Sequence, residues 1–122
     1  PAPAQLTAAE EERVERLIAT LQTSMWAHAG LLREESSLLE GLTALAAVEA
    51  NLDEIAASGR VGRRLAEAQS LSRVARAILI SALARTESRG AHFRSDHPRH
   101  DDAQFKKHSV VGSDGRVHFE AW

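Results

Sequence analysis

The sequence predicts an all-α fold, a three-helix up-down-up bundle with an irregular polar C-terminal tail and a candidate small hairpin near its end. Three long stretches carry aliphatic residues at steps of three or four, which is the period of an α-helix. Glycines separate these stretches, and the composition turns polar and irregular after Gly90. We therefore expect residues 1–6 to be a linker or an artificial boundary, residues 7–90 to form the bundle, and residues 91–122 to be an extended tail packed on it.

Composition narrows the functional classes. The 122 residues suffice for one domain with one core, and since aromatic residues make up only 4%, that core must be aliphatic. The net charge of -2 gives no electrostatic reason to expect nucleic acid or an anionic membrane as a partner. The lack of cysteine excludes a disulfide framework, a thiolate zinc site and a cysteine nucleophile. It also fits a reducing compartment, and since no signal peptide and no apolar run of about 20 residues is visible, we expect a cytoplasmic protein.

The first helix is predicted over residues 8–28. Thr7 and Glu10 have the spacing of a capping box, in which each side chain binds the backbone N–H of the other. The acidic run at residues 10–12 places negative charge at the positive end of the helix dipole. The apolar face then consists of Val14, Leu17, Ile18, Leu21 and Met25. Gly30 interrupts the pattern and ends the helix.

The second helix is predicted over residues 38–57, with a second capping box formed by Ser37 and Glu40. One apolar stripe follows, made of Leu38, Leu42, Leu45, Val48, Leu52 and Ile55. Gly59 stands where a C-terminal glycine is expected.

The third helix is predicted over residues 62–88. Its main face consists of Leu65, Ala68, Leu71, Ala75, Ile78, Leu79 and Ala82. Residues 74–84 are apolar on almost every side, so this helix should be buried on more than one side, either at the centre of the bundle or under a partner domain. Arg85 and Arg89 are expected in its last turn, and Gly90 is expected as its cap.

The tail is predicted to be irregular over residues 91–108 and to form a hairpin over residues 110–119. Asp114-Gly115 favours a tight turn between two short β-prone runs. A lone hairpin is only marginally stable in water, so it must lie against another part of the molecule. Phe93 and Phe105 are expected to hold the tail on the bundle.

Two catalytic or metal-binding hypotheses can be written for the tail, and we favour neither. Potential metal ligands are His92, Asp96, His97, His100, Asp101, Asp102 and His108, but no two of these histidines have the i, i+4 spacing of the zinc-enzyme helix. A hydrolytic triad of Ser88, His92 and Asp96 can also be assembled, but no strained elbow motif surrounds the serine. The simpler interpretation is a loop whose imidazoles and carboxylates bind one another and the backbone.

The arginines and lysines of the tail do not predict a nucleic-acid surface. Arg89, Arg94 and Arg99 are interleaved with acidic residues, and charges of opposite sign at such spacing usually pair. Trp26, at the end of the first helix, is interpreted as a core or interface anchor.

Two phrases of this sequence resemble a known family. Residues 87–98 read Glu-Ser-Arg-Gly-Ala-His-Phe-Arg-Ser-Asp-His-Pro, and His-Asp-Asp at 100–102 and Lys-His at 107–108 follow. Residues 25–33 read Met-Trp-Ala-His-Ala-Gly-Leu-Leu-Arg. Both resemble the C-terminal helical domain of the succinate dehydrogenase, fumarate reductase and L-aspartate oxidase flavoproteins, over roughly residues 10–110. Phe105 stands at the family's aromatic position, and His100 replaces its usual arginine.

The resemblance implies that this segment belongs to an enzyme whose chemistry lies elsewhere. Residues 86–96 read most like an L-aspartate oxidase, an FAD-dependent enzyme that oxidises L-aspartate to iminoaspartate on the pathway to NAD. In this family the dinucleotide loop belongs to preceding domains, and the present chain contains no Gly-x-Gly-x-x-Gly. We therefore expect no cofactor, no metal and no catalytic residue in this segment, which should be inactive alone. The alternatives are a succinate dehydrogenase or fumarate reductase flavoprotein subunit and a free-standing helical interaction module.

The resemblance and the apolar surplus of the third helix together imply a structural role. The expected partners are the flavin-binding and capping domains of the same chain, with neither nucleic acid nor a membrane involved. We expect Arg89, His92, Arg94 and Asp96 to form a hydrogen-bonded interdomain joint at that contact. Self-association of the isolated domain through its exposed face is a further expectation.

Overall fold

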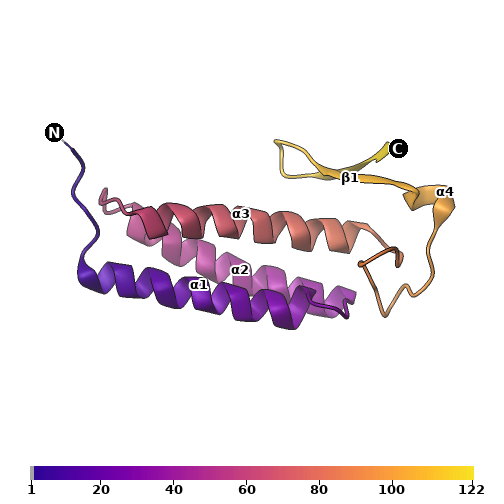
Figure 1. Ribbon diagram of the computed structural model, residues 1–122, viewed down its shortest axis with the longest axis horizontal. Helices are drawn as coiled ribbons and strands as arrows, with labels where there is room; N and C mark the ends of the chain where they lie inside the picture. Colours follow the sequence, from indigo (N-terminus) through magenta and orange to yellow (C-terminus); the bar gives the residue numbers. More distant parts are fainter. Residues whose placement is uncertain (1) are drawn as a thin grey trace.

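The structure is a computed structural model that describes residues 2–122, and it consists of three long helices side by side, a short helix and a hairpin (Figure 1). The elements are α1 (Ala8–Ala29), α2 (Glu35–Ala56), α3 (Arg63–Ala84), α4 (Asp102–Phe105), β1 (Lys107–Val111) and β2 (Val117–Ala121). The three long helices alternate in direction, which confirms the predicted all-α up-down-up bundle. No helix in residues 2–122 combines the length and the apolar character that crossing a membrane requires.

The start of α1 has the predicted capping box. The Thr7 hydroxyl accepts a hydrogen bond from the Glu10 N–H at 3.1 Å, and the Glu10 carboxylate accepts one from the Thr7 N–H at 2.9 Å. The two bonds satisfy backbone donors that the first turn of a helix leaves free. Arg60 reinforces this end because two of its nitrogens donate to the same carboxylate. α1 ends where Gly30 follows as the C-cap, as predicted.

The start of α2 differs from the prediction. The helix begins at Glu35, and the expected capping box is wrong, because the Ser37 hydroxyl donates instead to the carbonyl of His28 at 3.2 Å. The N–H of Glu35 donates to a carboxylate oxygen of Asp96, in the C-terminal tail, at 3.0 Å. The cap of this helix thus comes from a residue 61 positions away, which no local pattern reveals.

The end of α3 also differs from the prediction. The helix stops at residue 84, and Arg85 follows in an extended conformation with φ -87° and ψ 90°. Arg89 lies beyond the helix in a tight turn, where its N–H donates to the carbonyl of His92 at 2.7 Å and its own carbonyl accepts from the His92 N–H at 2.9 Å. Gly90 supplies the positive φ of 57° in this turn, so it is a turn residue and not the cap of α3. The early stop frees the following polar side chains to bind one another.

Two apolar clusters form the core, one toward each end of the bundle. The first lies toward the α2–α3 connection and consists of Leu6, Val14, Ile18, Val48, Leu52, Ile55, Leu65 and Ala68. The second lies toward the α1–α2 connection and consists of Leu21, Ala29, Leu38, Leu45, Ala75, Leu79 and Ala82. Most of these residues belong to the predicted stripes, so the helical period identified the core-facing sides correctly.

One side of α3 stays uncovered although it is apolar. α1, α2 and the hairpin contact the helix, but Leu71, Val74 and Ile78 remain 40%, 56% and 40% exposed. The spacing of these residues places them on one face. Trp26, at the end of α1, is 76% exposed, so it is not a core residue and the interface interpretation is the one that remains. An exposed apolar face of this extent is typical of an interaction surface.

The N-terminal segment is attached to the bundle by backbone hydrogen bonds. The N–H of Leu6 donates to the carbonyl of Val61 at 2.9 Å, and the N–H of Val61 donates to the carbonyl of Ala4 at 2.8 Å. Leu6 is only 7% exposed and belongs to the first core cluster. Pro1, part of the expected linker, lies outside the described residues. The division of the chain at residues 6 and 90 stays a prediction.

The tail ends in the expected hairpin, but its strands lie within residues 107–121 rather than 110–119, and α4 lies in the stretch 91–108 that the sequence predicts to be irregular. β1 and β2 pair antiparallel with Ser109 opposite Phe119, and Gly115 adopts a positive φ of 77° in the connecting turn. The rings of Phe105 and Phe119 meet edge to face with their centroids 4.9 Å apart, and Phe105 is 6% exposed. The Arg85 guanidinium, at the end of α3, lies 5.8 Å from the centre of the Phe105 ring, so Phe105 contacts the bundle as predicted, whereas Phe93 is 39% exposed.

Candidate functional site

A buried carboxylate is the centre of a polar network where α3 ends and the tail begins. Glu87 is 0% exposed. Its carboxylate accepts hydrogen bonds from Arg85, from two nitrogens of Arg89 at 2.9 and 3.0 Å, and from the N–H of Asp101 at 2.7 Å. Burial raises the pKa of Glu87, but the bonds from Arg89, Asp101 and Arg85 outweigh it and hold that pKa at about 2. Glu87 is therefore a permanent anion that connects the end of α3 to the segment before α4.

A buried guanidinium connects three elements in the same region. Arg94 is 1% exposed and binds both carboxylate oxygens of Asp96, at 2.8 and 2.7 Å. Its Nη1 donates to the carbonyls of Ala82 and Leu83, at 2.9 and 3.1 Å, which the end of α3 leaves free. The side-chain hydrogen bonds from Arg94 lower the pKa of Asp96 well below its usual range. Since Asp96 also caps α2 at Glu35, one ion pair fixes the end of α3 against the start of α2.

Arg85 attaches the hairpin to this network. Its guanidinium donates to the carbonyls of Phe105 and Lys107, both at 2.6 Å, and to the hydroxyl of Ser109 at 2.9 Å. It also lies 5.2 Å from the centre of the Phe119 ring, within the range of a cation–π contact. A single side chain therefore orients α4 and both strands relative to α3.

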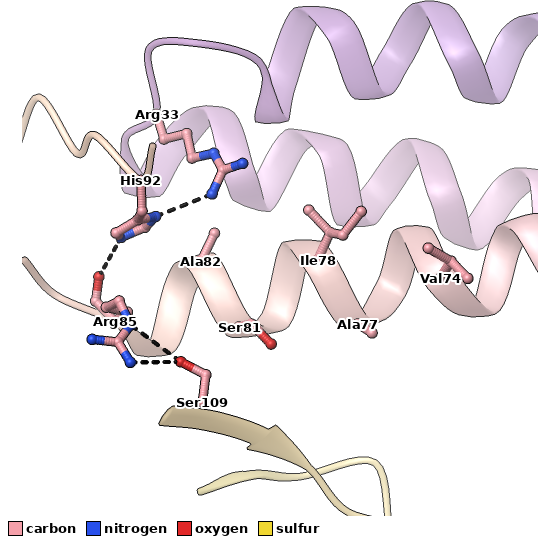
Figure 2. A pocket seen from close by; sticks show the side chains of 9 residues that line it. All are labelled: Arg33, Val74, Ala77, Ile78, Ser81, Ala82, Arg85, His92 and Ser109. Carbon is pink, nitrogen blue, oxygen red and sulfur yellow. Dashed lines mark hydrogen bonds between the residues drawn. The ribbon is translucent and has the colours of Figure 1, made fainter. Parts of the chain in front are cut away.

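His92 joins this network to the connection between α1 and α2 (Figure 2). Its Nε2 lies 3.0 Å from the carbonyl oxygen of Arg85, and its Nδ1 lies 3.1 Å from Nη1 of Arg33. A carbonyl can only accept, so Nε2 carries the proton, and Nδ1 then accepts the hydrogen bond from Arg33. Burial lowers the pKa of His92, and the positive charge of Arg33 adds to that effect. The imidazole is therefore neutral at neutral pH.

An open cleft of about 450 Å³ lies beside these residues. Figure 2 shows the side chains that line it, which are Arg33, Val74, Ala77, Ile78, Ser81, Ala82, Arg85, His92 and Ser109. Its floor along α3 is apolar, and its polar groups gather at the end where α3 stops. A second cleft adjoins it, shares Arg33 and Ile78, and includes Met25, Trp26 and Leu31.

The structure brings together the four residues predicted as an interdomain joint. Arg89, His92, Arg94 and Asp96 all lie at this end of the bundle, and each has a partner within the chain. Arg89 reaches Asp102 as well as Glu87, and Arg94 pairs with Asp96, so the interleaved charges of the tail pair as predicted. Arg94 is enclosed by the domain itself, whereas the other three reach its surface. Whether they meet another domain stays a prediction.

The candidate triad and the candidate metal ligands do not converge. The Ser88 hydroxyl donates to the carbonyl of His97 at 2.8 Å, Asp96 binds Arg94, and His92 binds Arg33 and the backbone. Each of the three is thus engaged elsewhere. Across residues 2–122, no group of three or more histidine, aspartate or glutamate side chains is arranged to hold a metal ion.

Sequence reasoning missed the roles of Glu87, Arg85 and Arg33. Glu87 stands between two arginines in the spacing Arg-x-Glu-x-Arg, a signal that would have identified it as a paired carboxylate. The sequence predicts Arg85 in the last turn of the third helix, whereas it follows that helix and holds the hairpin. Arg33 is the last residue of the motif at residues 25–33, but its position beside the cleft depends on backbone hydrogen bonds with Phe93 and Ser95.

The network suits a mechanical role. Its charged groups are saturated by one another, so they have little capacity left to bind a substrate or move a proton. They hold α2, α3, α4 and the hairpin in fixed positions. The cleft beside them has an apolar floor along α3, and the guanidinium groups of Arg33 and Arg85 lie at its polar end.

Comparisons with known proteins give the same family twice. A family model described as the fumarate reductase flavoprotein C-terminal domain matches residues 18–121. The L-aspartate oxidase of Pyrococcus abyssi is 43% identical over 65% of this chain and 13% of its own length. The L-aspartate oxidase of Bacillus subtilis is 38% identical over 75% of this chain and 16% of its own.

Related enzymes with other names also match. The succinate dehydrogenase flavoprotein subunit of Coxiella burnetii is 35% identical over 72% of this chain and 16% of its own length. A solved structure of the E. coli quinol fumarate reductase subunit FrdA superimposes with a TM-score of 0.67 at 24% identity, over 93% of this chain and 24% of that one. At that identity the likeness shows the fold. The chain thus spans only a small part of the curated relatives it matches.

Proposed function

The chain belongs to the fumarate reductase flavoprotein C-terminal family, and on that premise we propose that it is the C-terminal helical domain of an FAD-dependent L-aspartate oxidase. The observation that carries the proposal is the match of residues 18–121 to the family together with relatives named L-aspartate oxidase. The parent enzyme would oxidise L-aspartate to iminoaspartate in the synthesis of NAD, in the cytoplasm. FAD would be held by the preceding flavin domain, because this chain contains no dinucleotide-binding glycine loop.

The role of this domain would be to pack on the flavin-binding domain and fix the position of its neighbours. The exposed apolar face supports this role, since Trp26, Val74 and Ile78 would be shielded from water by such a contact. Burial of apolar surface stabilises a contact by about 25 cal/mol per Å². The domain alone would have no oxidase activity.

The four residues of the predicted joint would act at that contact in two ways. Arg94 and Asp96 would keep the end of the bundle rigid from within, since they bind the ends of α2 and α3. His92 and Arg89 would lie nearer the partner, beside the cleft and on the tail. A contact built on rigid elements loses less conformational entropy on association.

A succinate dehydrogenase or fumarate reductase flavoprotein subunit is the second candidate. The Coxiella burnetii relative favours it. Oxidation of L-aspartate and of succinate by the purified full-length flavoprotein would separate the two candidates. We expect turnover with L-aspartate; turnover with succinate alone would select the second candidate.

The structural role is tested by introducing a charge on the apolar face. Val74→Asp in the full-length enzyme should accelerate FAD loss and domain separation, because the charge would have to be buried at the contact. Leu39→Asp is the matched control, since Leu39 is a 48% exposed leucine on α2 and lines neither of the two clefts. Equal behaviour of the two variants in FAD retention and limited proteolysis would contradict the role.

A further inference from the structure

Arg33 differs from the other enclosed arginines in its lack of a counter-charge. Within residues 2–122, the other buried or half-buried arginines each pair with a carboxylate; they are Arg13, Arg60, Arg76, Arg85, Arg89 and Arg94. Half-buried Arg33 has only neutral partners in that part of the chain, the carbonyl of Gly30 at 3.3 Å and the imidazole of His92 at 3.1 Å. Partial burial lowers the pKa of Arg33. A cation that is partly withdrawn from water without an anion is a cost to this domain.

The position of Arg33 is nonetheless fixed. Its backbone N–H donates to the carbonyl of Phe93 at 3.0 Å, and its carbonyl accepts from the N–H of Ser95 at 2.7 Å. Its Nε and Nη1 are used for Gly30 and His92, which leaves Nη2 without a partner in residues 2–122. His92 does not neutralise Arg33, because its imidazole is uncharged: Nδ1 accepts from Arg33, and Nε2 donates to the carbonyl of Arg85. The guanidinium is therefore held in place with one side available.

The surroundings of that available side are apolar. Arg33 lines both clefts, so it stands between Val74 and Ile78 of α3 on one side and, on the other, Trp26 of α1 and Leu31 of the α1–α2 connection. Figure 2 shows its guanidinium beyond the end of the row formed by Val74 and Ile78. No acidic residue lines either cleft within the described chain. A ligand for this place must therefore bring an anion together with apolar groups.

We propose that Arg33 and the apolar walls of the two clefts form a socket for an aspartate or glutamate side chain of the flavin-binding domain of the same polypeptide. The proposal rests on the proposed function and adds the chemistry of the contact. The carboxylate would take the free edge of the guanidinium, and neighbouring apolar residues would cover Val74, Ile78 and Trp26. An ion pair that apolar side chains shield from water stabilises a contact more than a solvent-exposed ion pair does.

Charge complementarity favours this occupant over a second copy of the chain. A symmetric dimer brings the same face of both subunits together, so it would place two Arg33 guanidinium groups on faces whose clefts contain no acid. The bulk of the related enzymes lies outside this domain, since the chain covers 24% of the FrdA chain and 13% to 16% of the L-aspartate oxidases described above. The remainder of the flavoprotein would therefore supply the surface that meets the socket.

The test is a series of substitutions at one position in the full-length flavoprotein. FAD release in mild urea should be close to wild type for Arg33→Lys, at least tenfold faster for Arg33→Ala, and faster again for Arg33→Glu. The order follows from charge, since lysine keeps the cation, alanine removes it and glutamate opposes the carboxylate. Arg73→Glu is the matched control, because Arg73 is exposed on α3 and its side chain donates to Ser70. A lysine or arginine substituted for the partner carboxylate should restore retention in the Arg33→Glu variant.

Each outcome decides between the socket and its alternatives. If Arg33→Glu releases FAD no faster than Arg33→Ala, or no faster than Arg73→Glu, the socket is overturned, while the effect of Val74→Asp still reports the docking role. If Val74→Asp also has no effect, the proposed function fails with it. Sedimentation that shows an Arg33-dependent dimer would assign the site to another occupant and overturn the proposal, as would inorganic phosphate that slows FAD release from wild type but not from Arg33→Ala. Urea unfolding of the 122-residue chain should give Arg33→Ala, Arg33→Glu and Arg73→Glu similar midpoints, which separates a docking defect from a folding defect.

Discussion

The two ends of the bundle both carry arginine–carboxylate pairs, but in different surroundings. At the α2–α3 end, Arg60 binds Glu10 at 2.7 Å and Arg64 binds Glu15 at 2.6 Å, and the arginine side chains are 39% and 48% exposed. At the α1–α2 end, the side chain of Glu87 is 0% exposed and that of Arg94 is 2% exposed. The pair geometry is similar, so the difference lies in solvent access.

Solvent access decides what each pair does. An exposed pair exchanges one set of hydrated charges for another, and such pairs usually change stability little. A buried charge cannot return to water when its partner is removed, so breaking a buried pair is strongly destabilising. We infer that the α2–α3 end depends on apolar packing, and that the α1–α2 end depends on its ions. The following substitutions in the 122-residue chain test this comparison, from the largest effect to the smallest.

Arg94→Ala should have the largest effect. It leaves Asp96 without its bidentate partner, frees the carbonyls of Ala82 and Leu83, and weakens the cap of α2. We expect a loss of about 3–5 kcal/mol in the free energy of unfolding, measured by urea denaturation. Arg73→Ala is the matched control and should change little. A loss for Arg94→Ala as small as that of the control would show that the buried network does not stabilise this end.

Glu87→Gln should rank second, with a loss of about 2 kcal/mol at neutral pH, because two arginines lose their anion while the shape is kept. The folded pKa of Glu87 is about 2, below the value of 4.5 for an unperturbed group. The group therefore stabilises the fold above that unperturbed value, and the stabilisation is lost as pH falls from about 4.5 to about 2.

Acid titration of the unfolding midpoint with and without salt would sharpen the comparison. The side-chain hydrogen bond from Arg60 is the largest of the effects that hold the pKa of Glu10 at about 2, but this pair is less enclosed than the Glu87 carboxylate, since the Arg60 and Glu10 side chains are 39% and 17% exposed. We expect Glu87→Gln to reduce the dependence of the unfolding midpoint on acidic pH at both low and high salt. Glu10→Gln should reduce that dependence only at low salt. Equal salt sensitivity of the two variants would contradict the distinction between the ends.

Thr7→Ala should rank third. It removes the local cap of α1, and caps of this kind contribute about 1 kcal/mol to the free energy of unfolding. Thr7→Ser retains the hydroxyl and is the matched control. A loss as large as that of Arg94→Ala would mean that local capping, rather than the buried ions, dominates stability.

Arg64→Ala should have the smallest effect. The side chains of its two carboxylate partners, Glu15 and Glu67, are 53% and 38% exposed. We expect no measurable change in the urea midpoint. A clear drop would show that the surface pairs act as a cooperative network, which would remove the contrast between the two ends.

The local sequence pattern is sufficient to predict the three helices, their core-facing stripes, the cap of α1 and the hairpin turn. These features depend on residues a few positions apart, such as Thr7 with Glu10 and Asp114 with Gly115, so the local pattern contains the whole interaction. The family could also be predicted from the sequence, because residues 25–33 and 87–98 are contiguous motifs that can be recognised without the fold.

The first residue of α2, the last residue of α3 and the burial of the charged groups all depend on tertiary contacts. Asp96 caps α2 from the tail, and Arg94 takes the carbonyls that α3 leaves free, so both boundaries depend on partners far away in the sequence. Whether a charge is buried, and whether it has a partner of opposite charge, depends on everything that packs around it. The sequence therefore does not show that Glu87 and Arg33 differ in this respect. Glu87 is neutralised within the domain, and Arg33 is held beside an apolar face without a carboxylate of its own in residues 2–122.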